Sequence, residues 1–347
     1  MLGLSYPMLG GAEPERFAMR FLSTALTMLL LTALGAAPAA AKAAKPAALD
    51  LKTVNEAQFS EKRGKGISPA ILKAQILLDR ARFSPGTIDG RGGENFDKAV
   101  AAFAKAQGLK DDGLTKELFD KLAATSTEPV VQEYAITAED VKGPFVPKIP
   151  AKMEDMAALD RLGYRNEVEA LAEKFHMDEG LLKALNPGKP FGKAGTAILV
   201  ANVKNDKPGA KAGKLVVRKS EHALQALDKD GKLVAFYPAS IGSEEKPAPS
   251  GSYKVERVAQ NPTYTYNPKY KFKGVKSDKP FTIKPGPNNP VGAVWIDLSL
   301  ESYGIHGTPD PAKVGKTYSH GCVRLTNWDV RQLAQMVEKG TPVEFVD

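Results

Sequence analysis

The spacing of apolar residues changes once along this chain, and the change limits what each part can fold into. Between residues 68 and 185, apolar residues recur mainly at the three- and four-residue spacing of helices. From Lys214 onward, short runs rich in β-branched and aromatic residues alternate with turn residues, which is typical of strands. One late helix is expected, where Thr326 and Asp329 form a capping-box pattern. The sequence therefore predicts a multidomain protein with an all-β C-terminal domain of barrel or sandwich type.

The composition bounds the number of domains and the available chemistry. With 347 residues, of which 43% are hydrophobic and 25% are charged, the chain is long enough for two or three domains with their own cores. A single cysteine rules out an intramolecular disulfide and an all-cysteine zinc site, and only four histidines are present. We expect neither a metal nor another cofactor. The net charge of +8 favours acidic partners such as wall polymers, phospholipid head groups or nucleic acid.

The N-terminal segment has the pattern of a secretory signal. Arg16 and Arg20 precede a mostly apolar run over residues 21–37, and three alanines at 39–41 provide a small-x-small cleavage site. We predict that residues 1–41 are a cleaved signal peptide, with Met1 or Met19 as the true start; an uncleaved anchor is the alternative. The mature protein would then lie in the periplasm or cell wall, without membrane insertion and without a nucleic-acid partner.

Three predicted helices follow a linker over residues 42–67. They occupy residues 68–125, with turn residues between them. The stretches Thr-Ile-Asp-Gly at 87–90, Gln-Gly-Leu at 107–109 and Asp-Gly at 112–113 resemble those of the peptidoglycan-binding three-helix domain. This resemblance implies binding to the cell wall; a generic helical bundle is the alternative, because the same residues also serve turns and cores.

A second small module is expected between two linkers. Residues 126–160 contain prolines at 129, 144, 147 and 150 and are predicted to be an extended linker. Residues 161–204 resemble a LysM module, on the strength of Leu-Ala-Glu-Lys-Phe at 171–175, Asn-Pro at 186–187 and a strand near 197–203. The resemblance implies a small α+β fold and glycan binding, and a plain α+β spacer remains the alternative. Residues 205–213 are a third predicted linker.

The densest chemical signal lies between residues 305 and 325. His306-Gly-Thr is followed by Ser-His-Gly-Cys-Val-Arg over residues 319–324. A thiol with an ordinary pKa is mostly protonated at neutral pH, so a nearby imidazole must accept its proton or pair with its thiolate. His320 and His306 are both candidates for this base. We favour His306, because it ends a separate predicted strand over 301–305 and can approach Cys322 across the sheet.

The C-terminal residues 214–347 closely resemble the L,D-transpeptidase family of YkuD type, through the two motifs above. By this resemblance, Cys322 is the nucleophile and His306 the base, which the Gly307 carbonyl orients. The backbone N–H groups of Gly321 and Cys322 would form the oxyanion hole. Ser319 and His320 are predicted to fix the loop at the substrate site. Arg324 either binds a substrate carboxylate or holds the loop, and the residues leave both roles open.

Other residues have plainer interpretations. His176 and His222 are predicted to be surface or packing residues without partners. A zinc site made of His306, His320 and Cys322 is disfavoured, since no water-activating Glu is in view. Residues 264–287 interleave aromatic residues with lysines and are predicted to form a hairpin or lid beside the active cleft, with a solvated edge as the alternative.

The predicted function is that of an exported cysteine L,D-transpeptidase. The resemblance implies that Cys322 attacks a peptidoglycan stem tetrapeptide, releases D-alanine and passes the acyl group to an amine. The partners would be stem peptides and glycan, with another stem or a wall-attached protein as acceptor. Two alternatives remain: an L,D-carboxypeptidase that transfers the acyl group to water, and a non-catalytic wall-binding scaffold.

Overall fold

The computed structural model describes residues 49–61, 64, 66–204, 209–243, 246–270, 274–319 and 321–347. The predicted signal peptide and His320 lie outside these residues. The residues from Ala47 to Asp347 belong to one compact unit. Within the described ranges, no helix is both long enough and apolar enough to cross a membrane.

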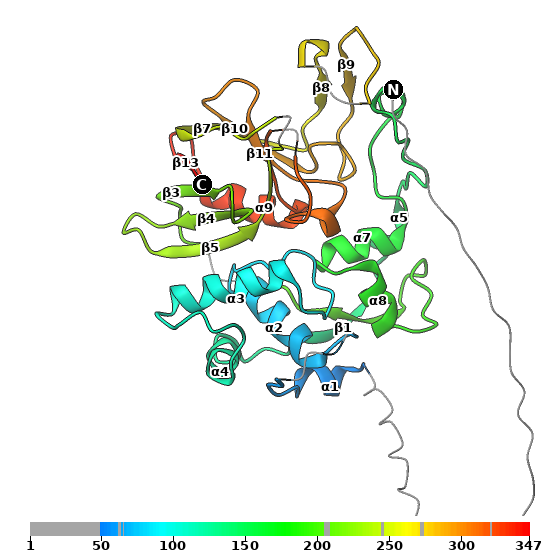
Figure 1. The fold of residues 1–347 in the computed structure, drawn as a ribbon. Helices are drawn as coiled ribbons and strands as arrows, with labels where there is room; N and C mark the ends of the chain where they lie inside the picture. The colour runs from blue at the N-terminus through cyan, green and yellow to red at the C-terminus, as the bar shows by residue number, and fades with distance from the viewer. Residues whose placement is uncertain are drawn as a thin grey trace, which may run out of the picture. The chain divides into compact units, whose positions relative to one another are not determined.

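Three helices form where the sequence predicts them (Figure 1). They are α2 (Pro69–Arg80), α3 (Glu94–Ala106) and α4 (Lys116–Ala123). Ser68 begins α2 by accepting a hydrogen bond from the Ile71 N–H, and Thr115 begins α4 in the same way with Leu118. These caps satisfy N–H groups that a helix start leaves free, which explains why the predicted and observed starts agree.

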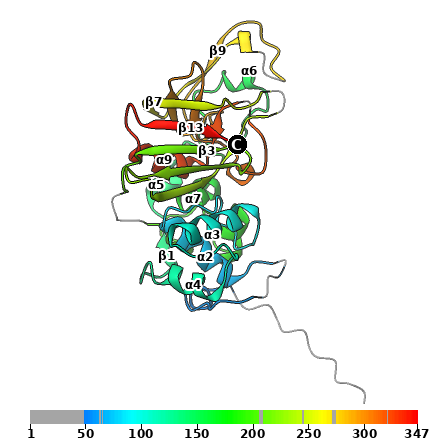
Figure 2. The ribbon, with the colours of Figure 1, turned by 60° about the vertical axis from the view of Figure 1, so that its left-hand side comes forward.

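The C-terminal part is built on one nine-stranded mixed sheet with the strand order β5-β4-β3-β13-β7-β10-β11-β12-β6. Figure 2 shows β7, β13 and β3 side by side in this sheet. Its strands are β3 (Lys214–Arg218), β4 (Ala223–Leu227), β5 (Leu233–Pro238), β6 (Ser240–Ile241), β7 (Gly251–Gln260), β10 (Val294–Leu298), β11 (Gly304–His306), β12 (Val323–Arg324) and β13 (Pro342–Val346). Helix α9 (Asn327–Met336) packs its Val330 and Leu333 into the same hydrophobic core as the sheet. The prediction of a β-rich C-terminal part with one late helix is confirmed.

A small hairpin stands beside this sheet. Strands β8 (Tyr264–Tyr266) and β9 (Phe281–Ile283) pair antiparallel with each other, and the 3-10 turn η1 (Pro268–Tyr270) follows β8. A second 3-10 turn, η2 (Pro311–Lys313), lies between β11 and β12. The hairpin occupies the segment predicted as a lid, although residues 271–273 of that segment lie outside the described residues.

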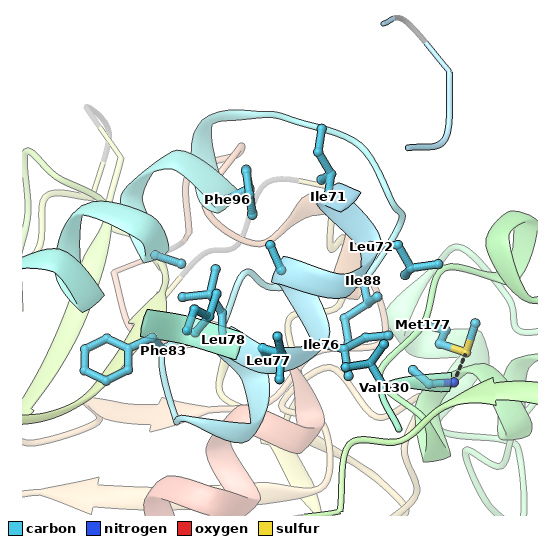
Figure 3. Packing of buried hydrophobic residues seen from close by; sticks show 14 of the residues in the cluster. Ile71, Leu72, Ile76, Leu77, Leu78, Phe83, Ile88, Phe96, Val130 and Met177 are labelled. Carbon is cyan, nitrogen blue, oxygen red and sulfur yellow. Dashed lines mark hydrogen bonds between the residues drawn. The ribbon is translucent and has the colours of Figure 1, made fainter. Parts of the chain in front are cut away.

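The helical part shares its hydrophobic core with the segments that follow it. Figure 3 shows Val130 and Met177 beside the buried residues of α2, and Phe236 of β5 belongs to the same cluster. Backbone bonds cross these boundaries too: the Ile88 N–H donates to the His176 carbonyl over 2.9 Å, and the Ser84 N–H donates to the Phe236 carbonyl over 2.9 Å. Domain limits at 125 and 204 stay predictions, and the buried residues on their two sides are in contact.

Two predicted linkers contain regular structure, which corrects the expectation. In residues 42–67, helix α1 (Leu51–Asn55) forms, and the Asn55 side chain bonds to both backbone groups of Val131. In residues 126–160, strand β1 (Val131–Ala135) and the short helices α5 (Ala138–Lys142) and α6 (Met153–Met156) form. The prolines that suggested an extended chain lie outside these elements, so they did not prevent them.

Strand β1 completes the small α+β module. It pairs antiparallel with β2 (Ala197–Ala201), and helices α7 (Glu167–Lys174) and α8 (Glu179–Leu185) lie between them in the chain. The βααβ order was predicted, but its first strand lies some thirty residues earlier than the predicted module start. Whether this module is of LysM type stays a prediction.

His176 has partners, contrary to expectation. Its Nδ1 lies 3.0 Å from the Asp79 carboxylate of α2, and its ring stacks on Trp328 of α9 at a centroid distance of 5.1 Å. Burial lowers the pKa of His176, but the charges of Asp79 and Asp329 outweigh it and the pKa is raised. The sequence could not reveal this contact, because its members come from three distant segments.

Candidate active site

Two parallel strands bring the predicted base and nucleophile to one edge. β11 and β12 pair so that His306 lies opposite Arg324, two residues after Cys322. The Leu325 N–H donates to the His306 carbonyl over 2.8 Å and extends this pairing. The strand predicted over 301–305 is shorter in the structure, because β11 begins only at Gly304. Residues 299–303 form a turn after β10, closed by the Leu298 N–H, which donates to the Tyr303 carbonyl. Residues separated by sixteen positions are thereby placed beside one cavity.

The His306 imidazole is held by its own neighbour. Its Nδ1 lies 2.7 Å from the Gly307 carbonyl oxygen. A carbonyl can only accept, so Nδ1 carries the proton and Nε2 is left with a free lone pair. Trp295 of β10 stacks on the ring at a centroid distance of 5.5 Å and an angle of 19°. The ring is therefore held in the tautomer that a general base requires, and the catalytic role of Gly307 stays a prediction.

Burial favours the neutral form of both reacting groups. Burial, and then the charge of Arg324, lower the pKa of His306 to about 3. Burial raises the pKa of the Cys322 thiol, although Arg324 and a backbone bond at Gly304 oppose the shift. The thiol donates to the Ser302 carbonyl over 3.7 Å. The sequence left open a proton transfer to imidazole or a preformed ion pair, and the two pKa shifts favour the neutral thiol and imidazole.

The loop before Cys322 is fixed from within. The Ser319 hydroxyl donates to the Cys322 carbonyl and accepts from the Gly321 N–H over 3.2 Å. Gly321 has a φ of +120°, and a Cβ there would lie 2.9 Å from the Tyr303 hydroxyl, so only glycine fits without strain. The Gly321 N–H was predicted to face an oxyanion. In this structure it is bonded to Ser319 instead, because the hydroxyl lies within the same tight turn.

Two positions near the base, 292 and 307, require glycine because the Asn327 side chain lies too close for a Cβ. A Cβ on Gly307 would lie 2.1 Å from Oδ1 of Asn327, and one on Gly292 would lie 2.2 Å from the same atom. This Oδ1 accepts the Ala293 N–H over 2.9 Å. The residue whose carbonyl orients His306 thus lies close to a buried amide of helix α9. The family resemblance predicted a role for Gly307, but no sequence signal pointed to Asn327.

The site opens into a cavity of about 330 Å³. It is lined mainly by apolar side chains and contains the sulfur, the imidazole and the guanidinium together. The lining residues are Met153, Met156, Tyr264, Asn288, Pro290, Val291, Trp295, Ser302, His306, Thr308, Pro309, Asp310, Ser319, Cys322 and Arg324. Tyr264 comes from the hairpin predicted as a lid, and burial followed by the nearby Cys322 raises its pKa.

Arg324 is the cation of this cavity. Burial lowers the pKa of its guanidinium, and Asp310 and Cys322 oppose that shift. Its Nε atom is buried and has no hydrogen-bond partner among the described residues. A buried donor without a partner is costly. Arg324 also lines the cavity, and its two predicted roles, binding a substrate carboxylate or holding the loop, stay predictions.

The lining residues that sequence reasoning missed include Met153, Met156, Trp295 and Ser302. Ser302 lies in the turn before β11, and Trp295 lies in the neighbouring strand β10. No local sequence motif predicts that either residue lines the cavity. Met153 and Met156 come from helix α6, inside a segment predicted to be only a spacer. Residues 153–156, two acidic residues between two methionines, are too short a segment to predict a helix. These residues join the site only through the tertiary fold.

Neither His176 nor His222 lines this cavity. His222 packs against Tyr318 with ring centroids 5.7 Å apart and lies outside the lining, in line with its predicted packing role. His320 is outside the described residues, so its predicted role in the loop stays a prediction. The described part of the chain contains no group of three or more His, Cys, Asp or Glu side chains arranged for a metal ion.

Comparisons with known proteins show what this chain is similar to. The L,D-transpeptidase catalytic domain model of YkuD type matches residues 212–345, and a putative peptidoglycan binding domain model matches residues 68–117. The probable L,D-transpeptidase YbiS of Escherichia coli is 30% identical over 189 residues, which are 53% of this chain and 61% of that protein. The crystal structure of L,D-transpeptidase 3 from Mycobacterium tuberculosis, in complex with a faropenem-derived adduct, aligns with a TM-score of 0.33 and 19% identity, over 44% of this chain and 67% of that one.

A further relative is matched over nearly its whole length. The putative L,D-transpeptidase YkuD of Bacillus licheniformis is 30% identical over 180 residues, which are 51% of this chain and 92% of that protein. The resemblances inferred for the catalytic and peptidoglycan-binding parts are confirmed, while the boundaries of these parts stay predictions. On this evidence, the chain belongs to the L,D-transpeptidase family.

Proposed function

We propose that this protein is an exported enzyme that uses Cys322 to acylate itself with a peptidoglycan stem tetrapeptide and then passes the acyl group to an amine. The observation that carries the proposal is the shared cavity of Cys322, His306 and Arg324. It supplies a thiol, a base of fixed tautomer and a cation in one mostly apolar space. Thiol acylation requires the first two, and recognition of a peptide carboxylate requires the third.

The acylation step follows from the neutral pair. Nε2 of His306 accepts the Cys322 proton as the sulfur attacks the carbonyl of the third, L-configured residue of the stem. The C–S bond forms, the C–N bond to the terminal D-alanine breaks, and the imidazolium returns its proton to the departing amine. The Gly307 carbonyl stabilises the imidazolium through the Nδ1 proton. The low pKa of His306 limits how long this imidazolium persists, which favours rapid return of the proton.

The second step decides between transfer and hydrolysis. An amine of another stem, or of a wall-attached protein, attacks the thioester, and the Cys322 thiol is restored when the amine proton passes back through His306. Water would give an L,D-carboxypeptidase instead. The mostly apolar lining, with Tyr264 of the hairpin beside the sulfur, favours exclusion of water and therefore transfer. Binding of stem peptides and glycan through residues 68–117 would keep the enzyme at its polymeric substrate.

Export and location complete the proposal. A thiol enzyme that acts on the wall must lie in the periplasm or cell wall, and the signal pattern over residues 1–41 fits that requirement. The non-catalytic scaffold is disfavoured, because the thiol, the base and the cation are all present in the cavity.

Mass spectrometry of products tests the proposal. Purified protein is incubated with disaccharide-tetrapeptide, and the expected products are cross-linked dimers and free D-alanine. Cys322→Ala protein serves as the control and should leave the substrate intact. A product mixture of only tripeptide with abundant amine acceptor would replace this proposal with the carboxypeptidase. Untouched substrate with wild-type protein would favour the scaffold.

A further inference from the structure

Helix α6 reaches the active-site cavity from a part of the chain that precedes the catalytic sheet. It comprises residues Met153–Met156, nearly sixty positions before β3. Figure 2 shows α6 close to β9, and the two elements are in contact. Met153 and Met156 line the cavity that contains the Cys322 thiol. This helix lies outside residues 212–345, to which the catalytic-domain model is matched.

We propose that Met153 and Met156 are specificity-determining residues that hold the aliphatic part of the group joined to Cys322. The identity of the natural acyl donor rests on the proposed function. The contact between these methionines and a group joined to Cys322 does not rest on the proposed function. It depends only on the position of two thioether side chains in the cavity of the reactive thiol. The proposal therefore assigns a substrate-selecting role to a segment that the sequence marked as a spacer.

The helix is tied to the hairpin loop by its own acidic residue. Oε1 of Glu154 accepts the Lys276 N–H over 2.7 Å and the Ser277 N–H over 3.2 Å. Glu154 lies between the two methionines in sequence, so these bonds hold the short helix against the loop. A four-residue helix has little stability alone, and such tertiary contacts are what keeps it folded.

The chain that follows α6 is anchored by backbone bonds to the segment that follows β9. The Leu162 N–H donates to the Pro285 carbonyl over 3.0 Å, and the Asn288 N–H donates back to the Leu162 carbonyl over 2.9 Å. The Asn288 side chain also donates to the Gly163 carbonyl over 2.9 Å. At Gly286, with φ of +149°, a Cβ would lie 2.0 Å from the Leu162 oxygen. The segment is thus fitted closely to the catalytic part, which fixes where the methionines enter the cavity.

The side of the cavity formed by Met153 and Met156 is suited to alkyl groups. Met153 and Met156 share the cavity with Tyr264, Val291 and Trp295, so much of its surface is apolar. Methionine has three rotatable bonds and a polarizable sulfur, which suits it to alkyl groups of varied shape. A substrate whose carboxylate is bound by Arg324 would place its methylene groups against such a surface. Alkyl groups near the reacting carbonyl are therefore expected to increase the rate of reaction at the thiol.

A series of N-alkylmaleimides tests this contact without any transpeptidase activity. Cys322 is the single cysteine of the chain, so alkylation reports on this site alone. Rates are measured at one pH for N-methyl-, N-ethyl- and N-butylmaleimide, each divided by its rate with N-acetylcysteine. In wild-type protein, we expect this ratio to rise about threefold to tenfold from methyl to butyl, because burial of each methylene favours the encounter.

Substitution of Met153 and Met156 should remove the dependence of the rate ratio on alkyl chain length. In the Met153→Ala/Met156→Ala protein, the rise should fall to about twofold or less. The Met153→Leu/Met156→Leu protein should keep it, since leucine conserves apolar volume. Asp155→Ala is the matched control, because Asp155 is an exposed residue of the same helix that does not line the cavity. Thermal unfolding of each variant verifies that it is folded.

The outcomes separate this proposal from the proposed function. An unchanged chain-length dependence in the folded double-alanine protein would overturn the role of α6, whatever the enzyme does to stem peptides. Loss of the chain-length dependence in the double-alanine protein would support the role of Met153 and Met156. If the wild-type protein also leaves disaccharide-tetrapeptide intact, the proposed function is rejected while this role stands. If the protein does turn over the tetrapeptide, the double-alanine variant should raise KM about threefold or more and leave kcat within about twofold.

Discussion

Asn327 donates a hydrogen bond from Nδ2 to the Glu173 carboxylate over 3.0 Å, and this bond joins helix α9 to helix α7. The same side chain accepts the Ala293 N–H through Oδ1 and lies against the backbone of Gly307. Glu173 is buried, and burial raises its pKa although Asn327 and Tyr164 bond to it. One amide therefore links the α+β module to the residue whose carbonyl orients the catalytic imidazole.

Asn327→Ala should destabilise the protein and weaken the site. It removes the bond to Oε2 of the Glu173 carboxylate, which keeps its bond from Tyr164, and it leaves the Ala293 N–H without its acceptor. These losses cost about 2–4 kcal/mol of unfolding free energy. Urea unfolding measures the loss. Gln335→Ala, on the exposed side of the same helix, is the control and should change stability by about 0.5 kcal/mol or less. Equal stability of both variants would mean that the amide does not carry this link.

Cys322→Ala should abolish the acyl-enzyme, and His306→Ala should slow its formation by about 10²–10⁴-fold. The histidine variant loses the proton acceptor but keeps the thiol. Incubation with a carbapenem, followed by intact-mass measurement, detects the adduct and its rate of appearance. A covalent adduct on the Cys322→Ala protein would show that another residue is the nucleophile.

The rate of acylation should lack an acid limb near the ordinary pKa of histidine. Burial lowers the pKa of His306 to about 3, so its Nε2 stays free of a proton well below pH 6. We expect the carbapenem acylation rate to show no decrease from loss of base between pH 7 and 5. On the alkaline side it should rise as the Cys322 thiol, whose pKa burial raises, begins to ionise. A half-maximal point near pH 6.5 that disappears in His306→Gln protein would contradict the low pKa.

Asp329→Asn should make stability less dependent on pH. Burial, and then the charge of Asp79, raise the pKa of Asp329 to about 7. Between its unfolded value of about 4 and this value, the folded state holds a proton that the unfolded state releases, so this group's contribution to stability falls as pH rises. The asparagine variant removes that term and keeps an acceptor for the Ser84 hydroxyl, which lies 3.0 Å from the carboxylate.

The measurement for Asp329→Asn is urea unfolding at pH 5 and pH 8. The free energy of unfolding of the variant should gain about 1–4 kcal/mol on wild type between these two pH values. Asp140→Asn is a useful contrast, because bonds from Lys174 and Tyr134 overcome its burial and lower its pKa to about 2. That variant should lose stability at pH 8 instead. If both variants gained, or both lost, free energy of unfolding relative to wild type at pH 8, the assigned pKa shifts would be contradicted.

The sequence by itself determined the local features. Caps at Ser68, Thr115 and Thr326 start helices where polar side chains can bond to the first free N–H groups, and this depends on neighbours three residues away. The motif around His306 and Cys322 likewise determined the predicted base and nucleophile, because both motifs are contiguous. The motif did not predict the partner of the Gly321 N–H, which is bonded to Ser319 in the folded loop rather than left free for an oxyanion.

Only the tertiary structure decided the contacts between distant segments. Strand β1 looked like part of a linker because its partner, β2, lies more than sixty residues later. Met153 and Met156 carry no helical pattern, and they become part of the cavity through bonds from Glu154 to the hairpin loop. The low pKa of His306 likewise arises from burial and Arg324. Periodicity and capping act over a few residues, whereas burial and pairing between segments depend on how the whole chain packs.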